Sequence, residues 1–189
     1  GDGNDSLDAD HDDYSNTDMS GNDTLSGGKG NDGLSGGLGA DVLAGDSGND
    51  GGYFYWEGET VDTMADTFDG GTGRDTFSVG WSNAQKWNYE FIVGATIRVK
   101  VNNVLVATAS NVEEFLVQGN ADGTYKFTGS DATDDRVRLG SMARGDDTIN
   151  TFGGNDSIES AFGSDRIDAG KGNDTVNVIM GGKDNVKAG

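Results

Sequence analysis

The chain has 189 residues, among them 33 glycines, no proline and no cysteine, and its formal net charge is −20. The lack of cysteine excludes a disulfide framework and a cysteine-ligated metal site. Such acidity argues against nucleic acid and anionic membrane surfaces as partners, and no apolar run approaches the length of a membrane-spanning segment.

Residues 1–50 form a first block built on a nine-residue unit, Gly-Gly-x-Gly-x-Asp-x-(apolar)-x, which is clearest from 27 to 50. The glycines let the first six positions turn freely, and the last three form a very short strand around Leu34 or Leu43. One unit cannot bury a core, so the units must stack. Disorder is the alternative for an acidic, glycine-rich chain, but here the acids are periodic. The aspartates of this register are Asp5, Asp23, Asp32, Asp41 and Asp50.

One unit of the first block, residues 9–17, has lost the pattern, and Tyr14 stands where the aspartate belongs. Its acidic stretch, Asp8–Asp13, resembles the start of an EF-hand loop but lacks that loop's glycine and final glutamate. Two interpretations stay open, a bulged turn that binds one extra ion and a solvated loop. His11, the single histidine, is read as a loop residue.

An aromatic and acidic loop is predicted over residues 51–69, which opens with the aromatic run Tyr53–Trp56. Clustered aromatics mark recognition surfaces, so a glycan or partner contact is one interpretation. The other is a loop that packs its rings on the rest of the chain. The repeat resumes over residues 70–78, with Asp75 at the aspartate position.

Residues 79–128 are predicted to be a small β-rich insert that continues or caps the first roll. Glycine becomes sparse there, and Ile97, Val99 and Val101 alternate with cationic residues as in a half-buried strand. Asn102-Asn103 is a plausible hairpin turn.

Residues 129–189 form a second block, in which four aspartates are spaced by nine and each is followed two places later by isoleucine or valine. Two further aspartates flank this run out of phase. β-Branched residues at the apolar position favour strand. The in-phase aspartates are Asp147, Asp156, Asp165 and Asp174, and the flanking ones are Asp135 and Asp184.

The spacing has an energetic consequence. In a two-sided roll, alternate turns lie on one edge, which places like aspartates about 4.8 Å apart. Two carboxylates at that distance repel by a few kcal/mol at an effective dielectric near 20. Calcium, which accepts six to eight carboxylate and carbonyl oxygens, reverses the sign of this term. We therefore expect several Ca²⁺ ions to be part of the fold.

This nonapeptide resembles the calcium-binding repeat of the RTX (repeats-in-toxin) family. The resemblance covers both blocks and implies an all-β, right-handed parallel β-roll with calcium between adjacent turns. It also implies an extracellular or cell-surface protein exported by type I secretion. The calcium ligands that it implies are Asp5, Asp23, Asp32, Asp41, Asp50, Asp75, Asp135, Asp147, Asp156, Asp165, Asp174 and Asp184.

The function predicted first is a calcium-folded structural module without catalytic residues. A glycan- or partner-binding module and the accessory part of a secreted enzyme, such as an epimerase or lipase, are the alternatives. Gly189 joined to Gly1 would complete another repeat loop. We therefore expect either a piece of a longer roll or a subunit that stacks head to tail into filaments, because such heterologous contacts do not close.

Overall fold

The computed structural model describes residues 1–9, 21–56, 64–81, 88–94, 96–119, 123–131, 133–140, 144–178 and 181–189. In these parts of the chain the regular structure is β, and no helix there has the length and apolarity needed to cross a membrane. Most of the acidic stretch Asp8–Asp13 and residues 57–63 of the predicted aromatic and acidic loop lie outside the described residues.

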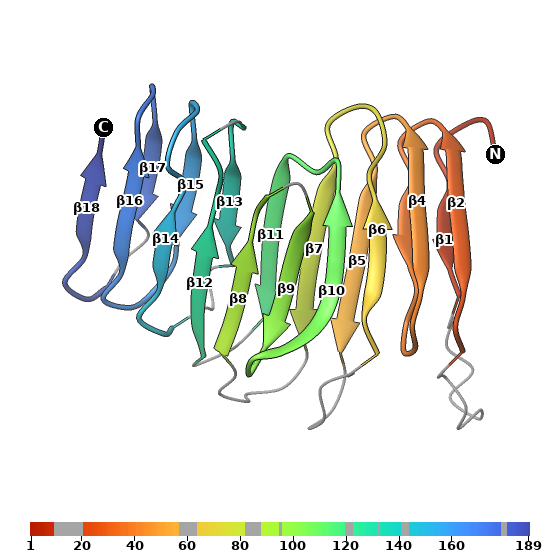
Figure 1. The fold of residues 1–189 in the computed structure, drawn as a ribbon, viewed down its shortest axis with the longest axis horizontal. Coiled ribbons are helices and arrows are strands. Elements are labelled where there is room, and N and C mark those ends of the chain that lie inside the picture. Colours follow the sequence, from red (N-terminus) through yellow and green to blue (C-terminus); the bar gives the residue numbers. More distant parts are fainter. Residues whose placement is uncertain are drawn as a thin grey trace.

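The strands form two sheets that face each other along the whole length of the molecule (Figure 1). All pairs of the eight-stranded sheet are parallel. Its strands, in spatial order, are β1 (Ser6–Asp8), β3 (Gly33–Ser35), β5 (Gly51–Trp56), β7 (Thr76–Trp81), β11 (Glu114–Gly119), β13 (Arg136–Leu139), β15 (Ser157–Ser160) and β17 (Thr175–Val178).

The ten-stranded sheet is parallel except where β9 pairs with its two neighbours. Its strands, in spatial order, are β2 (Thr24–Lys29), β4 (Val42–Ser47), β6 (Asp66–Asp69), β10 (Val104–Ser110), β9 (Ile97–Val101), β8 (Asn88–Ile92), β12 (Thr124–Thr128), β14 (Thr148–Asn150), β16 (Arg166–Gly170) and β18 (Asn185–Ala188). Successive repeat units alternate between the two sheets, so the predicted all-β parallel roll is confirmed.

The core lies between the sheets and is filled by the apolar position of each repeat. Leu34 and Leu43 of the first block, and Ile149, Ile158 and Ile167 of the second, are at most 1% exposed. Parallel pairing in register stacks such residues on their counterparts one full turn away, as with Leu25 and Leu43 or Ile149 and Ile167. The nine-residue period therefore produces an apolar row inside each sheet, in which Gly52 takes the place between Leu34 and Phe77.

In the middle of the roll, β8, β9 and β10 form an antiparallel meander inside the ten-stranded sheet. In the facing eight-stranded sheet, β7 pairs directly with β11. β9 buries Ile97, Val99 and Val101 against the core, as its alternating pattern predicts. Asn102 and Asn103 turn the chain into β10 with φ of 48° and 69°, which fits a two-residue hairpin turn. The predicted β-rich segment thus adds strands to the sheet.

Residues 51–56, predicted to lie in a loop, instead form strand β5. Gly52 and Phe54 face the core, and Phe54 stacks on Phe77 with ring centroids 4.9 Å apart. Tyr53 points outward and is 45% exposed. Gly52 leaves room for a ring of the facing sheet, since a Cβ there would lie 2.7 Å from Phe68 Cγ. Because the four residues 53–56 are all aromatic, the sequence shows no alternation of polar and apolar residues that would indicate a strand.

Candidate metal centres

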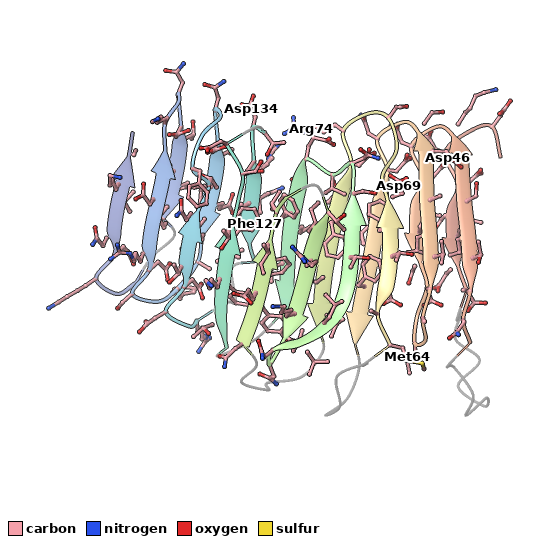
Figure 2. The ribbon with its side chains drawn as sticks, viewed as in Figure 1. Asp46, Met64, Asp69, Arg74, Phe127 and Asp134 are labelled. Carbon is pink, nitrogen blue, oxygen red and sulfur yellow. The ribbon has the colours of Figure 1, made fainter. Side chains whose placement is uncertain are left out.

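The structure places the twelve predicted aspartates in two rows, one along each edge of the roll. The upper row belongs to the loops that enter the eight-stranded sheet, at the edge marked by Asp46, Asp69, Arg74 and Asp134 in Figure 2. The lower row belongs to the loops that enter the ten-stranded sheet, at the opposite edge (Figure 1). The upper row holds Asp5, Asp32, Asp50, Asp75, Asp135, Asp156 and Asp174, and the lower row holds Asp23, Asp41, Asp147, Asp165 and Asp184.

Each row is held together by hydrogen bonds between like aspartates. The Oδ1 atom of Asp50 accepts the backbone N–H of Asp32 at 2.8 Å, and Oδ1 of Asp75 accepts that of Asp50 at 2.8 Å. The two out-of-phase aspartates join the same pattern, because Asp135 donates to Asp156 at 2.8 Å and Asp184 accepts from Asp165 at 2.9 Å. A carboxylate that accepts an N–H makes a strong, charge-assisted bond.

The second carboxylate oxygen is the unusual one. In six of these side chains the Oδ2 atom is buried, and the described part of the chain offers it no hydrogen-bond partner. Burying a polar oxygen without a partner costs free energy, and burying an ionised carboxylate costs far more. A cation or a proton is therefore required at these positions. The six are Asp32, Asp50, Asp75, Asp147, Asp156 and Asp174.

Backbone carbonyl oxygens lie close to the same glycines as these Oδ2 atoms. A Cβ placed on Gly45 would lie 2.5 Å from the carbonyl oxygen of Gly70 and 2.6 Å from Oδ2 of Asp50. Residue 45 is therefore glycine because a side chain would collide with these oxygens, one from the carboxylate of its own loop and one from a carbonyl of the next turn. Among the described residues no three acidic or histidine side chains converge on one point. Carbonyls must complete any site, a mixture of hard oxygen donors that fits Ca²⁺.

A second glycine of each loop allows the turns to approach closely. Gly73 has φ +141°, and a Cβ on it would lie 1.5 Å from the carbonyl oxygen of Gly48 one turn away. L-residues rarely adopt this backbone conformation. The same contact recurs between Gly48 and Gly30, again at 1.5 Å. Glycine is therefore required for the close stacking of the loop backbones.

Burial raises the pKa of several of these carboxyl groups. The pKa of Asp147 is raised to about 8 and that of Asp135 to about 6, first because burial disfavours the charge and further because neighbouring aspartates repel it. The pKa values of Asp50, Asp75 and Asp165 are raised for the same first reason. Without a cation, these five carboxyl groups therefore keep their protons to a higher pH than an ordinary aspartate does.

One turn of the second block satisfies its aspartate differently. The hydroxyl of Ser160, which is buried, donates to Oδ2 of Asp165. The equivalent position five residues before the aspartate is glycine in three units of the first block, as at Gly45 before Asp50. A serine hydroxyl thus supplies the contact that the glycine-containing loops leave open.

Two carboxylates that the sequence analysis missed also belong to the rows. Oδ1 of Asp66 accepts the backbone N–H of Asp41 at 3.0 Å in the lower row. Oε2 of Glu113 accepts the backbone N–H of Asp75 at 2.8 Å in the upper row. Each is followed two places later by a buried phenylalanine, Phe68 or Phe115, and this acid-x-apolar signal was available in the sequence.

The lower row is interrupted in the middle of the ten-stranded sheet. Ala107 stands in register with Asp66, and Tyr89 stands in register with Tyr125. The two tyrosines stack with ring centroids 5.1 Å apart, and the backbone N–H of Tyr125 donates to Oδ1 of Asp147, where the row resumes. Aromatic packing replaces carboxylates over this stretch.

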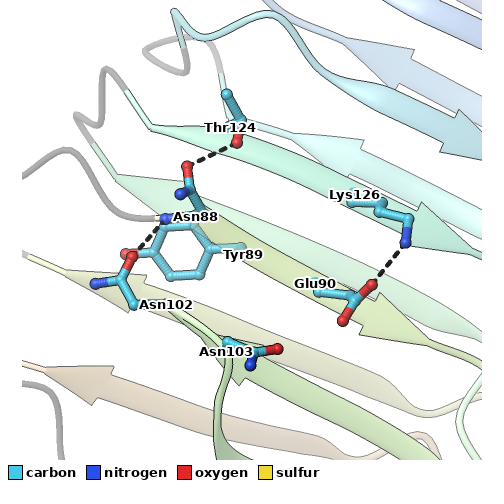
Figure 3. Close-up of a pocket in the computed structure, with 7 residues that line it drawn as sticks. All are labelled: Asn88, Tyr89, Glu90, Asn102, Asn103, Thr124 and Lys126. Atoms are coloured by element: carbon cyan, nitrogen blue, oxygen red, sulfur yellow. Dashed lines mark hydrogen bonds and ion pairs between the residues drawn. The ribbon is translucent and has the colours of Figure 1, made fainter.

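A shallow polar pocket opens on the outer face of the same stretch (Figure 3). Lys126 Nζ lies 2.6 Å from Glu90 Oε1, and Thr124 Oγ1 donates to Asn88 Oδ1 at 2.9 Å. Asn102 Oδ1 accepts the backbone N–H of Asn88 at 3.1 Å. These polar groups hydrogen-bond to one another across neighbouring strands.

Comparison with known families gives an independent result. The model of the RTX calcium-binding nonapeptide repeat matches the chain in four copies, over residues 18–51, 62–83, 143–176 and 162–185. The search of curated proteins gave no match. The matched ranges contain every predicted aspartate of the two rows except Asp5 and Asp135.

Proposed function

The chain belongs to the RTX calcium-binding nonapeptide repeat family, and from this premise we propose that it is a calcium-folded structural module of a secreted or cell-surface protein. The single observation that carries the proposal is the set of buried Oδ2 atoms that the described residues leave without a partner. Calcium, when bound, balances the negative charge of these buried carboxylates and coordinates their oxygens.

The chain's own residues prepare the sites. The Oδ1 hydrogen bonds fix each carboxylate, as between Asp50 and the N–H of Asp32 at 2.8 Å, and so hold Oδ2 beside a glycine of the loop, as Gly45 beside Asp50. The proposed ligands are the aspartates of the two rows and the loop carbonyls. In this proposal the blocks 1–50, 70–78 and 129–189 bind the ions, and 79–128 spans the distance between them.

The same arrangement leaves the rows no catalytic task. Their carboxylates are explained as ligands, and the polar pocket of Figure 3 is satisfied internally. We therefore propose a non-enzymatic role. An extracellular location follows from the chemistry, because a chain that needs calcium to neutralise its rows folds where calcium is abundant.

Calcium titration into the chelator-treated protein tests the proposal. Far-UV circular dichroism and solution scattering are recorded at each calcium concentration, with magnesium as the control ion. The expected result is a cooperative gain of β-structure with compaction in calcium alone. A chain that is fully folded in chelator, or that folds equally in magnesium, would contradict the proposal.

Head-to-tail association is a second candidate, favoured by the ends of the roll. β1 and β2 lie at one end of the two sheets, and β17 and β18 lie at the other. The hydrogen bonds between row aspartates have one polarity, since the Oδ1 atoms of Asp32 and Asp174 both accept from the turn before. A further repeat, from a second copy or a continuing chain, would extend both sheets and both rows. Sedimentation velocity at increasing calcium tests this, and a constant monomer mass would contradict it.

A further inference from the structure

We propose that Glu113 completes a calcium site with Asp75 and the backbone carbonyl of Asn111, and that this site carries the upper row across the junction of the two repeat blocks. Glu113 and Asn111 lie outside the four family matches. The inference rests on the proposed calcium-binding function and names a site that the repeat pattern does not contain.

The register of the strands puts Glu113 in the row. β11 lies between β7 and β13, and its first residue, Glu114, pairs with Thr76 on one side and Arg136 on the other. The residue before each of these is an acid, so Glu113 takes the place between Asp75 and Asp135. Its Oε2 accepts the backbone N–H of Asp75 at 2.8 Å, just as Oδ1 of Asp75 accepts that of Asp50 at 2.8 Å.

A buried oxygen without a partner points to a ligand here. Asp75 is 1% exposed, and its Oδ2 has no hydrogen-bond partner among the residues that the structure describes. A Cβ on Gly70 would lie 2.7 Å from this Oδ2 and 2.2 Å from the carbonyl oxygen of Asn111. The two oxygens therefore both lie close to Gly70, where they leave no room for a side chain. This repeats the arrangement above Gly45 in the preceding turn of the same row.

The turn that supplies Asn111 is shorter than a repeat loop. Residues 111–113 connect β10 to β11, whereas residues 70–75 connect β6 to β7. Asn111 adopts φ +53°, and its Nδ2 donates to Asp69 Oδ1 at 2.7 Å, which ties the turn to the adjacent full-length loop. Glutamate is one methylene longer than aspartate, and this extra reach lets the short turn place a carboxylate where the row needs one.

The consequence is a difference between the two edges. The lower row is interrupted by Ala107, Tyr89 and Tyr125, whereas strand register places an acid at every position of the upper row from Asp5 to Asp174. The hydrogen-bond pattern changes after Glu113, because its N–H donates to the carbonyl oxygen of Asp75 and Oδ1 of Asp135 accepts from Thr133 Oγ1. In the proposed arrangement, the ion at Glu113 links ion binding in the two blocks along the upper edge.

The test counts bound calcium in Glu113→Gln. Glutamine keeps an oxygen that accepts the N–H of Asp75 and removes the charge. The control is Glu159→Gln on the outer face of the same sheet, where Glu159 lies 3.9 Å from Arg138. Native mass spectrometry at saturating calcium is expected to show one ion fewer in E113Q than in the wild type, and the wild-type count in E159Q. Calorimetric titration of E113Q is expected to separate into two phases.

An unchanged ion count with a single phase in E113Q overturns the inference and leaves the calcium-folded module intact. A wild type that binds no calcium overturns the proposed function itself, so the two failures are distinguishable. A second measurement uses the wild-type fold. With isotope-labelled glutamate, calcium is expected to shift a side-chain carboxylate stretch in the infrared spectrum, and the shift is expected to decrease in E113Q and persist in E159Q. No glutamate shift in the wild type would also overturn the inference.

Discussion

Replacing Asp147 by asparagine should change stability in opposite directions with and without calcium. Asp147 is 1% exposed, and its pKa is raised to about 8 because burial disfavours the charge. With an unfolded-state pKa near 3.9, this corresponds to a cost of about 4 kcal/mol at pH 7. Asparagine keeps the oxygen that accepts the N–H of Tyr125 at 2.9 Å and removes that cost. In chelator we therefore expect D147N to be more stable than the wild type by up to about 4 kcal/mol.

In calcium the order should reverse, because the ligand charge is lost. An ion held at 100 times its dissociation constant stabilises the folded state by about 2.7 kcal/mol, and D147N should lose about this amount. The assay is urea unfolding at pH 7 with saturating calcium, and in chelator with sodium sulfate to favour the compact state. Asp146→Asn is the matched control, since Asp146 is exposed and asparagine stands at the same loop position in other repeats, such as Asn155. D147N destabilised equally in both conditions would refute the reasoning.

Three further predictions concern the rows, the loops and the core. In calcium-depleted buffer the melting temperature should fall as the pH rises from about 4 to about 8. The reason is that the folded-state pKa values of Asp135 and Asp147, about 6 and about 8, lie above the unfolded value near 3.9. A calcium-free melting temperature that rises over this range would contradict this prediction. Gly73→Ala should destabilise the calcium-bound protein by more than about 2 kcal/mol, because its Cβ would meet the neighbouring backbone, whereas Gly94→Ala, with no atom nearer than 3.9 Å, should melt like the wild type. Phe127→Ala should cost about 3–5 kcal/mol both in calcium and in chelator with sodium sulfate, because Phe127 is 2% exposed and packs in the core. Urea unfolding measures both values, and a loss in calcium alone would argue against this.

The repeats allowed much of the fold to be predicted from the sequence alone. A period of nine that combines a glycine loop with one apolar residue determines short strands, their parallel stacking and the burial of residues such as Leu34 and Ile158. It also determines which aspartates align, because identical units in register place identical positions side by side. This information is local and repeats along the chain, so no long-range contact is needed to read it.

Only the tertiary structure decided what happens where the repeat fails. The strand pairings of residues 88–128 depend on contacts between segments far apart in the chain, such as Ala107 with Asp66 and Phe115 with Phe77. No local pattern specifies these partners. The same pairings bring Asp66 and Glu113 into the rows and fit the out-of-phase Asp135 and Asp184 into register, because loop lengths can vary while strand register is held by the core. The sequence thus determined the repeating unit, and the packing of the two sheets decided where the rows continue and where they stop.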